Sequence, residues 1–268
     1  MNNTQEDKAK TFSALHEEGT FIMPNFWDAG SAVILQNLGA KALASTSAGF
    51  AQSLGRTDYK VSLSEKLAHL EQIAAITELP ISADFENGFA DSPETCAANL
   101  VAAAETGIVG ASIEDWSGTE IYDLNLAVER IAACAEARAK LDFDFILTAR
   151  AENLLHGIND LDDTIKRLVA FEEAGADVLY APGLATPEQV KAVIDAVSKP
   201  INVLFVFMPD RPLSFYQEMG VRRISLGSAL ANTVLGTTIA ATRSLLDDGD
   251  FSWVRGMASG KDMQKLLN

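Results

Sequence analysis

The hydrophobic pattern of the chain alternates between short apolar runs and longer amphipathic stretches. The apolar runs predict eight strands, at residues 20–25, 40–46, 80–85, 110–115, 144–150, 176–182, 200–205 and 221–227. Between them, apolar positions at helical spacing predict helices, for example at 62–78, 93–106, 125–140, 160–174, 186–197 and 228–246. Strands that are apolar on both faces and separated by helices are typical of an α/β protein with a parallel sheet.

Eight such units in about 230 residues favour a closed (β/α)8 TIM barrel over an open sheet. The first strand runs into "PNFWDAGSA" rather than a glycine-rich dinucleotide turn, which argues against the open nucleotide-binding fold. Ser62 to Glu65 fits a helix capping box, and Ser92 before Pro93 fits an N-cap. The first 18 residues predict an additional N-terminal helix, and the last 20 a polar, partly helical tail. No linker divides the chain, so we predict one domain over residues 1–268.

Composition excludes several functional classes. The net charge is −16, and a chain with so little cationic field is not expected to bind nucleic acid or an anionic membrane surface. No apolar run reaches the roughly 18 to 20 residues of a membrane span. The start "MNNTQEDKAK" lacks the apolar region of a signal peptide, so we predict a cytoplasmic protein. Cys96 and Cys134 lie in helical contexts, which predicts buried thiols rather than a disulfide framework.

Acidic residues gather at the ends of two successive predicted strands. Active sites of barrels lie at the carboxyl ends of the strands. Asp84 and Glu86 end the third strand two residues apart, so their side chains point the same way and can face one spot. Glu114 ends the next strand and can join them. Three converging carboxylates would repel one another unless a hard cation such as Mg²⁺, or Mn²⁺, sits between them; the alternative is that they are ordinary loop charges. The three histidines do not end strands, which argues against a zinc site.

A second group of polar residues could bind an anion. Arg150 emerges from the apolar strand "FILTAR" and needs a carboxylate partner, from Glu152, from Glu114 or from a substrate. The run Ser45, Thr46 and Ser47 could supply hydroxyls and backbone N–H groups to the same substrate carboxylate. The turn "SLGSA" at 225–229 and the loop residue His156 are interpreted as an ordinary turn and a surface residue.

The motifs "PNFWDAGSA", "STSAGFAQSLGRTD", "ADFENGF", "SIEDW" and "LTARAEN" occur in this order at the ends of strands one to five. Together they resemble the phosphoenolpyruvate mutase/isocitrate lyase superfamily over roughly residues 20 to 245. The resemblance implies a barrel whose eighth helix swaps between subunits of a homodimer or homotetramer. It also implies Mg²⁺ bound to a small α-keto or α-hydroxy acid, with chemistry at the adjacent C–C or P–C bond.

Residue roles follow from the resemblance position by position. Asp84 matches the metal-binding aspartate, Glu86 stands in for a second acid, and Glu114 matches the glutamate that holds metal-bound water. Arg150 matches the arginine that stabilises an enolate or carboxylate. The remaining matches are one segment and two single positions. The segment Ser45, Thr46 and Ser47 binds the substrate carboxylate, Asn202 is a substrate contact, and Asp58 lies on the segment leading into the mobile active-site region.

The loop after strand four departs from the family pattern. The isocitrate and methylisocitrate lyases carry a Lys-Lys-Cys-Gly-His loop whose cysteine is the general acid, and the mutases carry a lysine and an asparagine there. This chain reads "IEDWSGTEIYDLN" instead. We therefore expect a Mg²⁺-dependent C–C lyase or decarboxylase-type enzyme, from the branch without the cysteine loop, in which Tyr122 or water protonates the enolate. The alternatives are a P–C bond enzyme, either a phosphonomutase or a phosphonopyruvate hydrolase, and a non-catalytic α-keto-acid binding protein.

Overall fold

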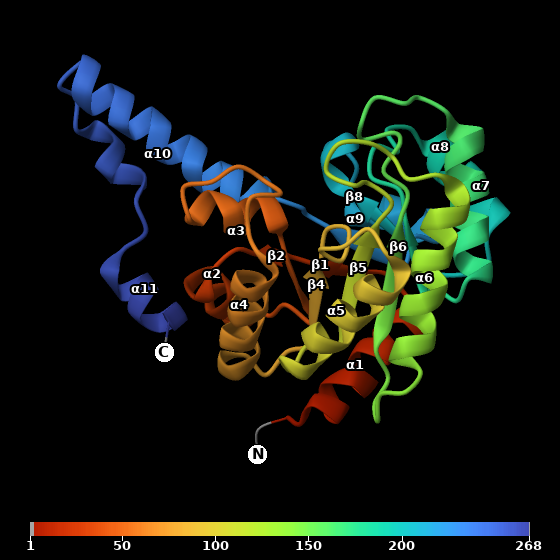
Figure 1. Ribbon diagram of the computed structural model, residues 1–268. Coiled ribbons are helices and arrows are strands. Elements are labelled where there is room, and N and C mark those ends of the chain that lie inside the picture. Colours follow the sequence, from red (N-terminus) through yellow and green to blue (C-terminus); the bar gives the residue numbers. More distant parts are fainter. Residues whose placement is uncertain (1–2, 268) are drawn as a thin grey trace.

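The centre of the protein is one parallel sheet that curves into a barrel, with helices on its outer face (Figure 1). The computed structural model describes residues 3–267. Within them, the strands are hydrogen-bonded in the order β1-β9-β8-β7-β6-β5-β4-β3-β2, and all pairs are parallel. The strands are β1 (Phe21–Met23), β2 (Asn25–Phe26), β3 (Leu43–Ser45), β4 (Ile81–Asp84), β5 (Gly110–Glu114), β6 (Ile146–Arg150), β7 (Val178–Tyr180), β8 (Ile201–Leu204) and β9 (Arg223–Ser225). This arrangement confirms the predicted (β/α)8 TIM barrel.

The first predicted strand is split in two by Pro24. Proline has no N–H to donate to a ladder, although its carbonyl oxygen still accepts a bond of 3.0 Å from the Ala44 amide. The segment before Pro24, β1, pairs with β9, and the segment after it, β2, pairs with β3. Residues 21–26 therefore close the barrel by joining its first and last strands.

Helices follow the strands and shield their outer face. They are α1 (Gln5–Glu17), α2 (Ala29–Asn37), α3 (Ser47–Ser53), α4 (Leu63–Ile76), α5 (Pro93–Glu105), α6 (Leu124–Arg138), α7 (Leu161–Glu173), α8 (Pro187–Ala196), α9 (Leu213–Met219), α10 (Ala229–Asp247) and α11 (Gly260–Leu267), with 3-10 turns η1 (Phe205–Phe207) and η2 (Ser252–Gly256). The capping box at Ser62 and the N-cap at Ser92 are confirmed. The predicted N-terminal helix is confirmed as α1, which packs with buried Phe12 against the starts of the strands, including Val109 and Ile146.

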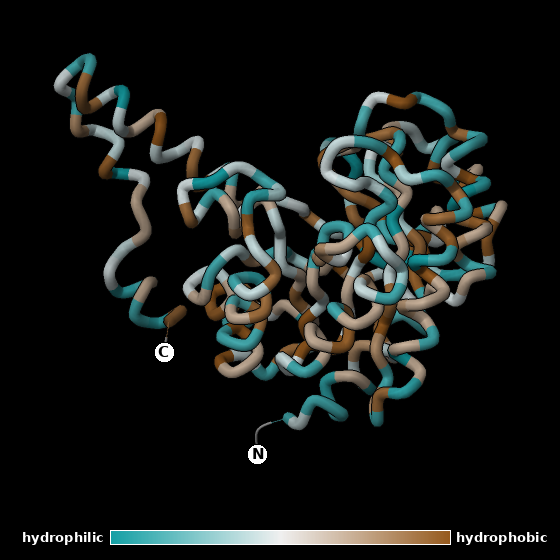
Figure 2. Tube along the Cα trace, viewed as in Figure 1, coloured by the Kyte–Doolittle hydropathy of each residue, from teal (hydrophilic) through white to brown (hydrophobic). Residues whose placement is uncertain are grey.

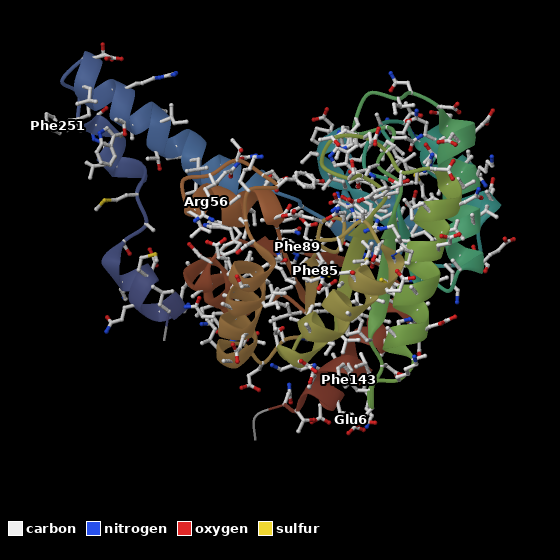
Figure 3. All side chains as sticks on the ribbon, in the orientation of Figure 1. Glu6, Arg56, Phe85, Phe89, Phe143 and Phe251 are labelled. Atoms are coloured by element: carbon white, nitrogen blue, oxygen red, sulfur yellow. The ribbon has the colours of Figure 1, made fainter. Side chains whose placement is uncertain are left out.

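The C-terminal segment departs from the barrel. Helix α10 begins at the barrel and projects away from it, with apolar positions along its length (Figure 2), and Ala231 is its one buried residue. Phe251 lies at the far end of the projection (Figure 3). The chain then returns, and α11 packs near α2, where the Asn37 side chain donates to the Leu266 carbonyl at 3.0 Å. None of the described helices is long and apolar enough to cross a bilayer. One domain over residues 1–268 stays a prediction.

Candidate active site

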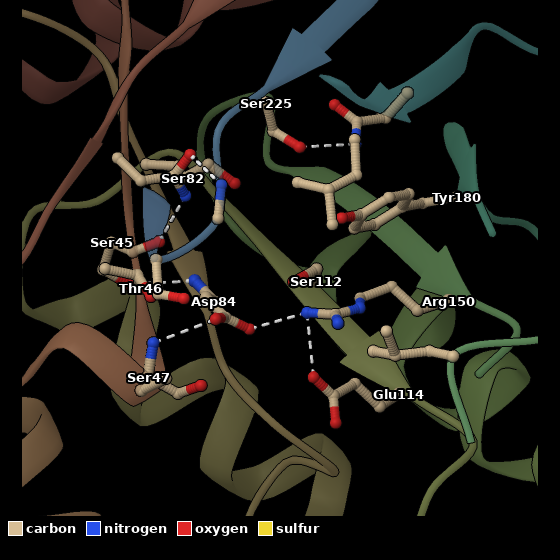
Figure 4. A pocket seen from close by; sticks show the side chains of 18 of the residues that line it. Ser45, Thr46, Ser47, Ser82, Asp84, Ser112, Glu114, Arg150, Tyr180 and Ser225 are labelled. Atoms are coloured by element: carbon tan, nitrogen blue, oxygen red, sulfur yellow. Dashed lines mark hydrogen bonds and ion pairs between the residues drawn. The ribbon is translucent and has the colours of Figure 1, made fainter. Parts of the chain in front are cut away.

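A cavity of about 340 Å³ opens at the carboxyl ends of the barrel strands (Figure 4). Most of the residues predicted from the sequence to form a site line it. They are Ser45, Thr46, Ser47, Asp58, Asp84, Glu114, Arg150 and Asn202. Two predicted residues, Glu86 and Tyr122, are not among the lining side chains.

Arg150, the last residue of β6, is the centre of the cavity's charge network. Its Nη1 lies 2.8 Å from a carboxylate oxygen of Asp84 and 2.8 Å from one of Glu114, and its Nε lies 2.7 Å from Glu152. Burial alone would lower the pKa of Arg150, but the three carboxylates outweigh it and raise that pKa well above its ordinary value. The register explains the encounter, because β5 pairs with β6 so that Glu114 stands opposite Arg150. Both alternatives raised for Arg150, a pair with Glu152 and a pair with Glu114, are therefore present together.

Asp84 is held from both of its oxygens. One binds Arg150, and the other accepts a bond of 2.9 Å from the backbone amide of Ser47, at the start of α3. The Ser45 hydroxyl oxygen accepts one hydrogen bond from the Asp84 amide, at 2.9 Å, and another from the Nζ of Lys66, at 3.0 Å. Although burial opposes it, the positive charges of Arg150 and Lys66 lower the pKa of Asp84. Asp84 is thus an ionised carboxylate fixed at the cavity wall.

Lys66 is a buried cation that the sequence interpretation missed. It is 1% exposed, and from α4 it reaches the hydroxyl of the lining residue Ser45 without lining the cavity itself. Burial lowers its pKa, while Asp84, Glu86 and Asp58 work in the opposite direction. The signal was available in the sequence, because Lys66 shares the apolar face of its helix with Leu70 and Ile73. A lysine is rarely buried there without an acidic or polar partner.

The predicted alignment of Glu86 with Asp84 is wrong. β4 ends at Asp84, and Glu86 has a left-handed backbone with φ of 48° in the turn that follows. The two-residue alternation of a strand therefore does not extend to it. Its side chain is 4% exposed, and burial, opposed by Lys66, raises its pKa to about 7. Its carbonyl oxygen accepts the Glu114 amide at 2.9 Å, so the turn is tied to the end of β5.

Glu114 and Glu152 complete the acidic wall. The hydroxyl of Tyr59, another lining residue missed from the sequence, donates a very short bond to Glu114. Burial raises the pKa of Glu114 well above its ordinary value, against the pull of Arg150. Burial likewise raises the pKa of Glu152 to about 7, and its second oxygen, Oε2, is buried without a hydrogen bond. The cavity therefore holds one carboxyl group, that of Glu152, whose pKa lies near neutral pH.

The carboxylates of the cavity could hold a hard cation only if water and substrate oxygens supply the remaining ligands. Among the described residues, no three His, Cys, Asp or Glu side chains are placed to hold a metal ion together. Asp84 and Glu114 do both line the cavity. Mg²⁺ commonly keeps several waters and takes only one or two carboxylates. The residues present therefore fit Mg²⁺ bound by one or two carboxylates plus water and substrate oxygens, and the roles assigned to Asp84, Glu86 and Glu114 stay predictions.

The other predicted residues lie at different depths. Asp58 lines the cavity beside Tyr59, and burial, followed by the charge of Asp84, raises its pKa. Asn202 lies deeper, where it donates to the Ser225 hydroxyl at 2.9 Å and accepts from Arg223 at 2.9 Å.

Tyr122 lies behind the wall rather than on it. Its hydroxyl donates to Asp91 and accepts from Asn87, and its ring stacks with the Arg130 guanidinium at 4.3 Å.

Two features interpreted as unremarkable in the sequence also reach the cavity. His156 lines it and stacks on Trp116, with ring centroids 3.6 Å apart. In the turn "SLGSA", Gly227 and Ser228 line it where α10 begins. Both features therefore contribute to the cavity lining, and His156 is at the same time exposed, as a surface residue is.

Comparison with known proteins decides the family. The family model described as phosphoenolpyruvate phosphomutase matches residues 12–246. The chain belongs to this family. The 2-methylisocitrate lyase of Escherichia coli is 30% identical over 200 residues, which cover 70% of this chain and 66% of that protein. The oxaloacetate decarboxylase of Paraburkholderia xenovorans is 27% identical over 199 residues, covering 70% and 64%. A Burkholderia cenocepacia protein, described from its crystal structure as a lyase or mutase candidate, is 46% identical with a TM-score of 0.92, covering 97% and 95%.

Membership of the phosphoenolpyruvate phosphomutase family confirms two predictions. The resemblance drawn from the strand-end motifs was correct, and the chain is an enzyme of the lyase or mutase type. The relatives are named as a lyase and a decarboxylase and the family model as a phosphomutase, which supports a lyase-like function at a C–C or P–C bond.

Proposed function

We propose that the protein is a Mg²⁺-dependent C–C lyase or decarboxylase-type enzyme acting on a small α-keto or α-hydroxy acid. The observation that supports this most is Arg150, a permanent cation at the cavity wall that already binds the Asp84 and Glu114 carboxylates. An arginine in this setting can exchange a protein carboxylate for a substrate oxygen on which negative charge develops. The names of the E. coli and P. xenovorans relatives support the reaction type.

The residues of the cavity divide the chemical work. Asp84 and Glu114 would hold Mg²⁺ together with water and substrate oxygens, with Glu86 in the turn behind them, and the ion would supply Lewis-acid chemistry. Arg150, on β6, stabilises the negative charge that develops on the substrate oxygen. The backbone and hydroxyls of Ser45, Thr46 and Ser47 orient the substrate carboxylate. Among the described residues, Tyr59 and Tyr180 are the phenols that line the cavity, so Tyr122 is poorly placed to protonate an enolate directly.

A substrate panel tests this proposal. Purified protein is assayed with oxaloacetate, methylisocitrate, isocitrate and phosphonopyruvate, each with Mg²⁺, with Mn²⁺ and with a chelator. We expect turnover of a C–C substrate that the chelator abolishes, and a loss of about 100-fold or more in Asp84→Ala. The matched control is Asp195→Ala, because Asp195 is an exposed aspartate paired with Lys191 on α8. Activity that survives both the chelator and Asp84→Ala would contradict the metal assignment.

Two outcomes would select the alternatives. Turnover of phosphonopyruvate alone would establish a P–C bond enzyme. Mg²⁺-dependent binding of oxalate without turnover of any compound would establish a non-catalytic binding protein.

We further propose that the enzyme is a cytoplasmic homodimer or homotetramer that exchanges α10. Val234, Ile239 and Leu246 on this helix are 51%, 52% and 75% exposed. A groove on the barrel between α2 and α9 is lined by Ile22, Leu35 and Leu213 among others, and Ile22 and Leu213 are 44% and 39% exposed. The apolar side chains of α10 from a second copy of the chain would pack against the apolar lining of this groove. Light scattering should give a dimer or tetramer mass, and Ile239→Lys should shift it toward the monomer, whereas a monomeric wild type would refute the exchange.

A further inference from the structure

The cavity has two chemically different walls. The wall formed by the ends of β3 to β6 carries the acids, Arg150 and the serines. A second part of the lining, the apolar wall, comes from the loop after β6 and from the end of β8 with η1, and it carries Leu155, Leu204, Val206 and Phe207. Leu155 and Val206 are 43% and 40% exposed, so folding leaves much of their apolar surface in water. Apolar side chains that are exposed and converge on a cavity beside its reactive groups are typical of ligand contacts.

The cations that line the cavity already have hydrogen-bond partners. Arg150 is bound by three carboxylates. Arg223, which lines the cavity as well, donates to Asn202 and Thr148 in the buried layer below. His156 is the titratable group beside Leu155, but burial and the charge of Arg150 lower its pKa, so it is a neutral ring stacked on Trp116. Arg211, four residues after Phe207, stacks on Phe215 and does not line the cavity. A second carboxylate or a phosphonyl group placed against this wall would lose water without gaining a charged partner.

We propose that the part of the substrate beyond the reacting carbon is an uncharged alkyl or aryl group that packs on Leu155, Val206 and Phe207. This rests on the proposed function, because the carboxylate end of the substrate is placed at Arg150 and Ser47. It narrows the substrate class to α-keto or α-hydroxy acids with an apolar substituent. It also disfavours substrates that carry a further carboxylate at that end. One feature would work against it: the first residue before α10, Ser228, lies at the cavity without a side-chain cap, and a helix N-terminus attracts anions.

A series of unreactive 2-oxo acids tests the apolar wall. Isothermal titration calorimetry with saturating Mg²⁺ would compare pyruvate, 2-oxobutanoate, 2-oxopentanoate and 2-oxohexanoate, with 2-oxoglutarate as the charged ligand of the same carbon number as 2-oxopentanoate. Each added methylene should lower Kd about fourfold, the value expected for burial of one methylene. 2-Oxoglutarate should bind roughly tenfold more weakly than 2-oxopentanoate.

Variants of the apolar wall distinguish specific packing on these side chains from nonspecific hydrophobic binding elsewhere. Phe207→Ala should reduce the gain per methylene to about twofold, because the substituent loses one side of its contact. Val206→Lys, a change at an exposed position that folding should tolerate, should reverse the order of 2-oxopentanoate and 2-oxoglutarate. Ile76→Ala is the control, since Ile76 is 42% exposed at the end of α4 and lies outside the cavity lining. It should leave the series unchanged.

The outcomes distinguish this inference from the function on which it rests. Two results would overturn the role of the apolar wall and leave the lyase proposal standing. One is equal affinity for pyruvate and its three longer homologues, and the other is tighter binding of 2-oxoglutarate than of 2-oxopentanoate. Absence of pyruvate binding together with no turnover in the substrate panel would overturn both.

Discussion

Two buried arginines inside the barrel occupy opposite electrostatic settings. Arg150, at the carboxyl end of β6, touches three carboxylates. Arg223, at the start of β9 and 2% exposed, has only neutral partners: it donates to Asn202 and Thr148 at 2.9 Å each and contacts the His16 ring at 3.3 Å. Burial lowers the pKa of Arg223, while the acids raise that of Arg150.

Both arginines line the cavity, but they differ in the chemical kind of partner that each one holds. The acids around Arg150 lie at a cavity wall, where a substrate anion or a cation can replace one contact with another. The groups around Arg223 are fixed amide, hydroxyl and imidazole atoms, and α1 closes that layer from below through His16, whose Nδ1 bonds to the Phe12 carbonyl at 2.8 Å. Burial and Arg223 lower the pKa of His16 to about 3, so His16 is neutral. We therefore assign reactivity to the Arg150 layer and structural support to the Arg223 layer.

Arg150→Met should produce the largest effect on activity. The substitution removes the cation that stabilises developing negative charge, for which losses of about 100- to 1,000-fold in kcat are usual. It also leaves Glu114 and Glu152 without their arginine and Asp84 with Lys66 as its remaining cationic neighbour, which should cost about 3–5 kcal/mol of unfolding free energy. Steady-state kinetics and urea denaturation measure the two losses. Retention of kcat within threefold would contradict the assignment of Arg150 to the reaction.

Arg223→Met should affect stability more than turnover. The Asn202 oxygen would lose its donor in a buried layer, a change that costs about 1–3 kcal/mol. We expect kcat to fall less than tenfold, because no carboxylate depends on this arginine. The same two measurements apply, and a loss of activity as large as that of Arg150→Met would erase the contrast between the layers.

Glu152→Gln should change the pH dependence of stability. The folded protein raises the pKa of Glu152 from 4.5 to about 7, so between these values the folded state holds a proton that the unfolded state has released. This group therefore makes the protein less stable as the pH rises from about 4.5 to about 7, with no further change above. The glutamine side chain would not titrate, so the Glu152→Gln variant should not show this decrease in stability. The difference in Tm between variant and wild type should grow in the variant's favour across this window, and a constant difference would show that Glu152 titrates normally.

Tyr122→Phe should have the smallest effect. Its hydroxyl bonds to Asp91 and Asn87 outside the cavity lining, so we expect a loss of about 1 kcal/mol in stability. Activity should stay within threefold. Tyr59→Phe is the informative comparison, because Tyr59 lines the cavity and binds Glu114. A large loss in Tyr122→Phe alone would restore the catalytic role first predicted for it.

The strand pattern and the strand-end rule were sufficient for the fold and for most of the cavity. They located Asp84, Glu114 and Arg150 because each ends a buried strand. They failed for Glu86, because no alternation reveals that a strand ends two residues early in a left-handed turn.

The residues that were missed reach the site from outside the strands or from deeper within them. Lys66 comes from a helix, Tyr59 from the loop before that helix, and Arg223 from the lower layer of β9. Contacts of this kind depend on how helices and loops settle on the barrel, which a single sequence pattern does not encode. The short helices α3 and α9, seven residues each, were also absent from the predicted pattern, because so few residues give no clear period.

The split strand around Pro24 has a consequence for the order in which the chain can be completed during synthesis. The Phe21 amide bonds to the Arg222 carbonyl at 3.0 Å, a contact between the beginning and the end of the barrel. A growing chain that leaves the ribosome from its N-terminus must keep β1 unpaired until β9 has emerged. Until then, the sheet has an open edge at β1 that could pair with a strand of another chain. Pro24 cannot donate a hydrogen bond, so fewer backbone groups of this edge are available for such pairing.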